Sequence, residues 1–214
     1  MAASHYEIAL LAGDAYKRAS HFVPGHPALI SPIDREIVVA VPGTHPTQLA
    51  DWLCDLDARP KPFAQIGFCH KGFGSAAVDL WNILDLKLPR HGQRIVYTGH
   101  SLGGAIALDL AGLHAASGRS PCRVITFGAP RVAFRLNHAL IALIGQALEA
   151  IQYERHGDIV PGVPWPPFFT HPAKRIKIGE AVRGLEGVDP LVNHEIARYI
   201  ADIANLAHPS LRAL

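Results

Sequence analysis

One short stretch, QRIVYTGHSLGGAIAL at residues 93–108, constrains the fold of this chain more than any other. Its first half is an apolar, β-branched run that predicts a buried strand, and its second half has the small and apolar residues of a helix. Between the two halves, Ser101 stands in a G-x-S-x-G pattern between Gly99 and Gly103. A strand that passes through such a turn directly into a helix predicts an α/β chain, with Ser101 held on a strained turn at the strand end.

Strands and helices alternate along the rest of the chain, which predicts a mostly parallel central sheet flanked by helices. We expect strands at 35–43, 63–69, 93–99, 123–128, 148–155 and 173–179, helices at 4–20, 73–88, 101–116, 135–146 and 193–207, and a loop at 21–32. No internal repeat or linker interrupts this pattern, so we expect one domain over residues 1–214.

Composition excludes several functional classes. Charged residues make up 18% of the 214 residues and the net charge is +2, which argues against nucleic acid as a partner. No apolar run is long enough to span a membrane, and the N-terminus lacks the features of a signal peptide. We therefore expect a cytoplasmic protein, or a secreted one whose signal is absent from this sequence. The oligomeric state is left open.

The metal-binding residue types form no recognisable motif. The 13 histidines include no H-E-x-x-H pair, so we predict no metal site. Three cysteines, Cys54, Cys69 and Cys122, match no zinc or redox spacing. Buried or free thiols are the favoured interpretation, and a Cys54–Cys69 disulfide is the alternative.

A nucleophilic serine needs a general base, and the base needs an acid that orients it. In folds with this turn, the chain order is Ser, then Asp or Glu, then His. His194 is the best-placed base, at the start of the last helix with Asn193 as its N-cap, whereas His171 lies in a Pro-rich loop and His208 near the tail. Asp158 follows the strand at 148–155 and is the expected acid, because Glu154 falls inside that strand and Asp189 is explained as a turn or helix-cap residue.

Two backbone N–H groups are expected to bind the oxyanion that develops when the nucleophile attacks. The first belongs to Leu102, at the start of the helix after Ser101. The second belongs to Thr44, which follows an early strand in VVAVPGTHP, where Gly43 allows a close approach. The alternative for Thr44 is an ordinary turn at a strand end.

The chain resembles the class 3 lipases, the fungal-lipase-like branch of the α/β-hydrolases. The matching segments occur in family order: PGT at 42–44, DWLCDL at 51–56, FCHKGF at 68–73, TGHSLGGAIA at 98–107, TFGAPRV at 126–132, RHGDIVPGVP at 155–164 and NHEIARYI at 193–200. This resemblance implies an α/β-hydrolase fold, the triad and oxyanion residues named above, an ester substrate and no cofactor. The chain departs from the family at Pro42, where Arg is common, and at Tyr199, which is the only aromatic residue near the position of a Tyr-Trp-like pair.

Residues 46–56 predict a short helix with one apolar face, formed by Leu49, Trp52, Leu53 and Leu56. In related lipases, this position holds the lid. We hypothesise that the helix opens at a lipid surface and contacts it transiently. The alternative is a fixed helix packed on the core.

Apolar residues beside the acid and the base are candidates for the wall that binds the substrate. They are Trp52 in the lid, Val160, Val163, Trp165, Phe168 and Phe169 after the acid, and Leu191 or Val192 before the base. Each of them is equally explained as a core residue. His70 matches a family histidine and is expected to support loop geometry instead of transferring protons.

These features predict a serine carboxylic-ester hydrolase, a lipase or esterase that cleaves acylglycerols or other fatty-acyl esters. Its partner is then a lipid or a small ester substrate. A phospholipase, a feruloyl or aryl esterase, or a thioesterase is the alternative on the same triad. A non-catalytic binding protein with this fold is disfavoured because no triad member is missing.

Overall fold

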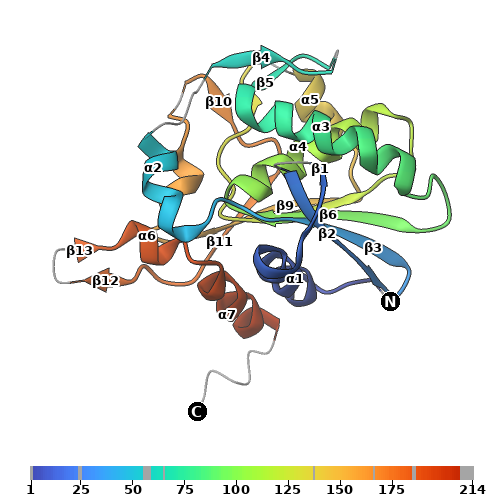
Figure 1. Cartoon of the computed structure of the whole chain (residues 1–214). Coiled ribbons are helices and arrows are strands. Elements are labelled where there is room, and N and C mark those ends of the chain that lie inside the picture. The colour runs from blue at the N-terminus through green and yellow to red at the C-terminus, as the bar shows by residue number, and fades with distance from the viewer. Residues whose placement is uncertain are drawn as a thin grey trace.

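The computed structural model describes residues 2–23, 26–54, 59–64, 66–136, 138–165, 167–184 and 187–207. Its centre is a seven-stranded sheet with the order β1-β2-β3-β6-β7-β9-β11 (Figure 1). The strands from β3 to β11 in that order run parallel, and β1 and β2 add an antiparallel edge. Their bounds are β1 Ser20–Val23, β2 His26–Ile33, β3 Glu36–Val41, β6 Arg94–His100, β7 Arg123–Phe127, β9 Glu149–Arg155 and β11 Lys174–Ile178.

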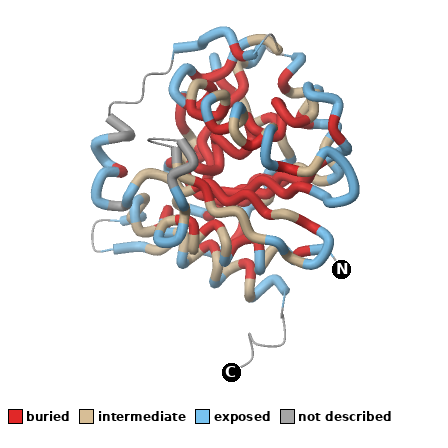
Figure 2. Tube along the Cα trace, turned by 45° about the vertical axis from the view of Figure 1, so that its right-hand side comes forward, coloured by how far each residue is buried: buried red, intermediate tan, exposed pale blue. Residues whose placement is uncertain are grey.

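Helices cover both faces of this sheet, which explains why its central strands are apolar on both sides (Figures 1 and 2). Val38 and Val96 belong to the core under α1 and α7, whereas their neighbours Val39 and Tyr97 belong to the core under α3, α4 and α5. The helices span α1 His5–Arg18, α3 Lys71–Lys87, α4 Leu102–Ala116, α5 His138–Gly145 and α7 Ile196–Ala207.

Helix α1 begins at a capping box. The Ser4 hydroxyl accepts a hydrogen bond from the Glu7 backbone at 3.2 Å, and the Glu7 carboxylate accepts one from the Ser4 backbone at 2.8 Å. Buried Ile8, Ala9 and Ala12 then pack the helix on the sheet. As a result, the last turn of α1 carries Tyr16 to the edge of the sheet where β3 and β6 end.

The structure corrects two expectations for the first third of the chain. The predicted loop at 21–32 is wrong, because β1 and β2 pair there, and β2 extends along β3 from Leu29 to Ile33. Pro32 lies beyond the part of β2 that β1 covers, so its missing N–H disturbs little. The predicted strand at 63–69 is also wrong in extent, because only its last two residues enter a strand.

That strand, β5 Phe68–His70, belongs to a separate small sheet. Its order is β10-β8-β5-β4, with β4 Pro60–Pro62, β8 Ala133–Phe134 and β10 Phe169–Thr170. A third pair, β12 Arg183–Gly184 and β13 Gly187–Val188, forms a hairpin ahead of the last helices.

The remaining helices are short. The predicted helix at 46–56 is observed as a 3₁₀ turn at Pro46–Gln48 followed by α2 Leu49–Cys54, and the side chains of Trp52 and Leu53, with all of Leu56, lie outside the described residues. A second 3₁₀ turn spans Val160–Gly162, and α6 spans Pro190–Asn193.

Two further observations concern the cysteines and the membrane. Cys69 and Cys122 are buried free thiols, so the alternative of a Cys54–Cys69 disulfide is wrong. Within the described ranges, the helices are too short or too polar to cross a bilayer.

Candidate active site

Ser101 occupies the sharp turn between β6 and α4. Its backbone angles are φ 57° and ψ −130°, a strained conformation for a residue with a side chain. The turn is held by a hydrogen bond from the Ser101 N–H to the Phe127 carbonyl at 3.0 Å and by one from the Gly104 N–H to the Ser101 carbonyl at 3.0 Å. The strained conformation expected for this turn is therefore observed.

Glycines allow the strand, the turn and the helix to approach one another. A Cβ on Gly103 would overlap the Val41 carbonyl oxygen, and a Cβ on Gly99 would overlap the Gly103 backbone. The G-x-S-x-G pattern thus reflects the close packing of α4 against the ends of β3 and β6.

His194 and Asp158 form a buried pair next to this turn. His194 Nδ1 donates to Asp158 Oδ2 at 2.8 Å, and the two side chains are 2% and 0% exposed. The other carboxylate oxygen accepts the Val160 N–H at 2.8 Å. Because Nδ1 carries the proton, Nε2 of the neutral ring is left as an acceptor. His194 Nε2 and Ser101 Oγ are both buried, and neither has a hydrogen-bond partner among the described residues.

A tyrosine completes the environment of the acid. The Tyr199 hydroxyl donates to Asp158 Oδ2 at 2.6 Å and accepts the Arg155 N–H at 3.0 Å. Gly128, at φ 59°, lies close to all three side chains of this cluster. A Cβ at this position would be 3.0 Å from atoms of Asp158, His194 and Tyr199. Sequence reasoning noticed Tyr199 only as a departure from the family, although a tyrosine on the buried face of a helix needs a partner for its hydroxyl.

His194 does not begin the last helix, so the expectation that Asn193 is its N-cap is wrong. Asp189 caps α6 by accepting the N–H groups of Leu191 and Val192, and His194 follows as the residue that ends α6. The buried Asn193 amide instead bonds Val182 through both its oxygen and its nitrogen, at 2.8 and 3.0 Å. The interruption between α6 and α7 turns the His194 ring toward the sheet edge.

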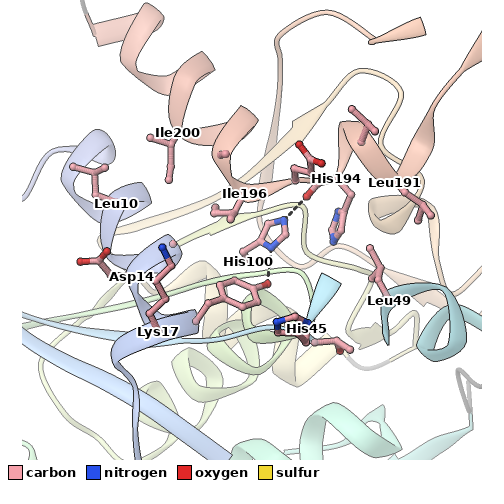
Figure 3. A pocket seen from close by; sticks show the side chains of 16 residues that line it. Leu10, Asp14, Lys17, His45, Leu49, His100, Leu191, His194, Ile196 and Ile200 are labelled. Carbon is pink, nitrogen blue, oxygen red and sulfur yellow. Dashed lines mark hydrogen bonds between the residues drawn. The ribbon is translucent and has the colours of Figure 1, made fainter. Parts of the chain in front are cut away.

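A second buried histidine, His100, connects α1 to the base. His100 Nε2 donates to the His194 carbonyl at 2.6 Å, and Nδ1 accepts from the Tyr16 hydroxyl at 2.8 Å (Figure 3). Burial, followed by the nearby His194 ring at a centroid distance of 4.4 Å, holds the pKa of His100 well below its usual value. His100 is therefore neutral and serves as a fixed link between Tyr16 and His194.

The loop after β3 lies against Ser101, where an oxyanion hole was expected from the sequence. A Cβ on Gly43 would be 3.0 Å from the Ser101 Cβ, and the Gly43 N–H also bonds the Tyr16 hydroxyl. The Thr44 hydroxyl is buried and has no hydrogen-bond partner in the described part of the chain. The Leu102 N–H belongs to the first turn of α4, where N–H groups have no partner within the helix.

A cavity of about 700 Å³ opens beside these groups (Figure 3). Thr44, His100 and His194 line it together with residues of α1, α2, α6 and α7. Leu191 and Val192 line it as well, whereas the candidates that follow the acid do not. Val160, Val163 and Phe169 are buried in the core, and Trp165 and Phe168 are 68% and 63% exposed.

His70 lies apart from the cavity, at the start of α3. Its ring is 2% exposed and stacks on Phe73 at 3.9 Å. The expectation that His70 supports the geometry of its loop stays a prediction. In the described ranges, no three His, Cys, Asp or Glu side chains come together as a metal site would require.

A serine on a strand-to-helix turn, beside a buried Asp–His pair at the same sheet edge, defines this protein as an α/β-hydrolase. Comparison with known families then gives the particular one. The sequence profile described as Lipase (class 3) matches residues 38–168, and the chain belongs to that family of ester hydrolases. No curated protein sequence matches the chain significantly.

Solved structures of lipases share the fold. The triacylglyceride lipase of Rhizomucor miehei is 22% identical with a TM-score of 0.64, over 81% of this chain and 78% of that one. Lip2 of Yarrowia lipolytica is 22% identical with a TM-score of 0.64, over 86% and 81% of the two chains. A triacylglycerol lipase whose catalytic centre is described as a serine protease triad is 23% identical, with a TM-score of 0.64, over 85% and 83%. The chain spans 66% of the Rhizomucor miehei lipase in its propeptide complex.

Proposed function

We propose that Ser101, His194 and Asp158 are the catalytic triad of a hydrolase that cleaves acylglycerols or other fatty-acyl esters. The observation that carries the proposal is a pair of buried atoms, Ser101 Oγ and His194 Nε2, that lack partners among the described residues while Asp158 fixes the imidazole. Membership of the class 3 lipases supports an ester as the substrate.

The proposed reaction proceeds in two half-reactions. As Ser101 Oγ attacks the ester carbonyl, His194 Nε2 takes its proton and then gives it to the departing alcohol. Water attacks the resulting acyl-enzyme in the same manner and releases the fatty acid. The N–H groups of Thr44 and Leu102 stabilise the oxyanion in both half-reactions, and the unpartnered Thr44 hydroxyl is a further donor toward it.

Asp158 stabilises the imidazolium that forms on His194 during each transfer. Three hydrogen bonds reach its carboxylate, from His194, Tyr199 and the Val160 backbone. These three hydrogen bonds fix the orientation of the buried carboxylate beside the His194 ring.

We also propose that the substrate is presented at a lipid surface and that α2 acts as the lid. Support comes from its position, because Leu49 in α2 lines the cavity beside Thr44. The measurement is the rate against a short-chain ester on passing from monomer to emulsion. A rise at the transition supports an opening lid, and a smooth saturation curve supports a fixed helix.

The catalytic proposal is tested by Ser101→Ala. We expect hydrolysis of p-nitrophenyl butyrate to fall by at least about 10⁴-fold, with an unchanged far-UV circular dichroism spectrum. Full activity in this variant would contradict the assignment. Phospholipid, feruloyl-ester and acyl-thioester substrates, tested beside an acylglycerol, separate the alternative substrate classes.

A further inference from the structure

The cavity beside His194 is walled by two helices that are far apart in sequence, α1 and α7. We propose that the channel between them binds the acyl chain of the ester, and that Gly13 and Ala197 limit the length of chain accepted. This inference rests on the proposed function. It moves the acyl site from the loop after Asp158, where sequence reasoning expected it, to the opposite side of the base.

The lining is mainly apolar along α7 and mixed along α1, where Asp14 and Lys17 lie beside Leu10 (Figure 3). Thr44, His100 and His194 line the cavity next to the reacting atoms, and Ile196 and Ile200 continue the wall along α7. Ile200 is one turn beyond Ile196 on the same face, so this apolar wall extends roughly 6 Å along α7. A volume of about 700 Å³ is within the range of sites that enclose an extended small ligand.

Two exposed leucines in the lining support an apolar occupant. Leu10 on α1 is 40% exposed and Leu191 on α6 is 43% exposed, and both line this cavity. Exposed apolar side chains of this size in one cavity are typical of a binding surface for apolar ligands. A bound hydrocarbon chain would remove both from water.

The carboxylates at the rim are already paired. Asp14 bonds Arg18 at 2.8 Å, and Glu195 lies 3.4 Å from Arg198. The first pair lies within α1 and the second joins the residue before α7 to its first turn, so neither carboxylate is left without a countercharge beside an apolar ligand.

Gly13 is a point of close contact between α1 and α7 in the wall of the cavity. A Cβ at this position would be 3.0 Å from Ile200 Cδ1 and 3.7 Å from Ile196 Cγ1. Glycine inside a helix destabilises it relative to alanine, so a packing reason is expected where one occurs. Here the missing side chain leaves Ile196 and Ile200 room to line the channel.

The chemistry favours the acyl chain over the alcohol as the occupant. The alcohol departs in the first half-reaction, whereas the acyl group stays bonded to Ser101 until water releases it. A channel that holds the acyl chain therefore contributes binding energy to both half-reactions. Each methylene group buried there is worth about fourfold in kcat/KM.

The test measures kcat/KM for p-nitrophenyl acetate, butyrate, octanoate and decanoate. In the wild type, kcat/KM is expected to rise along this series. Ala197→Phe is expected to lower the decanoate-to-acetate ratio of kcat/KM at least tenfold, and Gly13→Ala to lower it in the same direction. Ala201→Phe is the matched control, because Ala201 is exposed on α7 one turn further along and does not line the cavity.

Three further results distinguish a failure of the acyl-chain inference from a failure of the proposed function. An unchanged ratio in Ala197→Phe and Gly13→Ala, with the wild type active on all four esters, would overturn the inference and leave the proposed function standing. The inference would also be overturned if the substitutions changed how kcat/KM depends on the length of the alcohol in acetate esters, and not on the length of the acyl chain. Decanoate binding to the Ser101→Ala protein, measured by displacement of a fluorescent fatty acid and weakened by Ala197→Phe, supports the inference even if the wild type hydrolyses no ester.

Discussion

The hydroxyl of Tyr16 joins the two halves of the proposed catalytic machinery. It accepts the N–H of Gly43 in the oxyanion loop and donates to His100 Nδ1 at 2.8 Å. His100 in turn holds the His194 carbonyl at 2.6 Å. Tyr16→Phe removes this single oxygen and keeps the ring. Two polar groups, the Gly43 N–H and His100 Nδ1, then lose their partner.

The size of the effect follows from those two groups. A buried polar group that loses its partner costs about 1–3 kcal/mol. If that amount is lost from the alignment of Thr44 and His194 in the transition state, kcat falls about 5- to 150-fold. The KM for a short ester should change little, because Tyr16 acts through His100 and Gly43 and makes no contact with the scissile bond.

The assay is p-nitrophenyl butyrate hydrolysis at saturating substrate, together with urea unfolding. Tyr6→Phe is the control, since Tyr6 is half-buried on the same helix and roughly 15 Å from Tyr16 along it. A Tyr16→Phe protein that is folded and keeps kcat within twofold of the wild type would refute the linkage between α1 and the base.

Two other predictions concern buried groups outside the site. Asp109 is fully buried in α4, with neither carboxylate oxygen bonded among the described residues, and burial raises its pKa well above the usual value. Folding at neutral pH then requires that Asp109 take up a proton, which costs free energy. Asp109→Ala should therefore raise the free energy of unfolding by about 1–3 kcal/mol at pH 8, and by less at pH 4. A lower urea midpoint for Asp109→Ala at pH 8 would contradict this. Burial lowers the pKa of His171 to about 4, so the stability due to its neutral form is present above pH 6.5 and lost as the pH falls toward 4. From pH 7 to pH 4, the free energy of unfolding measured in urea should fall by about 3 kcal/mol more in the wild type than in His171→Gln. Equal losses in the two proteins would contradict this role of His171.

The turn at Ser101 and the pairing of Asp158 with His194 could be predicted, because the turn is encoded locally and the acid follows a strand end. Gly99, Ser101 and Gly103 are contiguous with the strand and helix that they connect, and Asp158 follows directly on β9. Parallel strands end at the same edge of the sheet, so residues just after them meet there without further information.

The residues that support the site come from pairings that no local pattern specifies. Tyr16 and His100 are 84 positions apart, and Tyr199 and Asp158 are 41 apart. A buried tyrosine hydroxyl needs a hydrogen-bond partner, but only the packing of α1 and α7 on the sheet decides which group supplies it.

The sequence indicated only part of this cavity: Leu191 and Val192 line it, whereas the candidates after Asp158 do not. The apolar stretch after Asp158 has the composition of a pocket wall, and so does much of a protein core. Val160 and Phe169 are buried, whereas residues of α1 and α7 line the cavity beside His194. Sequence periodicity predicted both helices but not the space between them.

The central claim, that Ser101 is a nucleophile activated by His194, is tested most directly by covalent labelling. The protein is treated with a fluorophosphonate, and the intact mass and the labelled peptide are determined by mass spectrometry. The account predicts one adduct per chain, on Ser101, with labelling at least about 10³-fold slower in His194→Ala. No adduct on the folded protein, an adduct on another residue, or labelling of His194→Ala at the wild-type rate would contradict it.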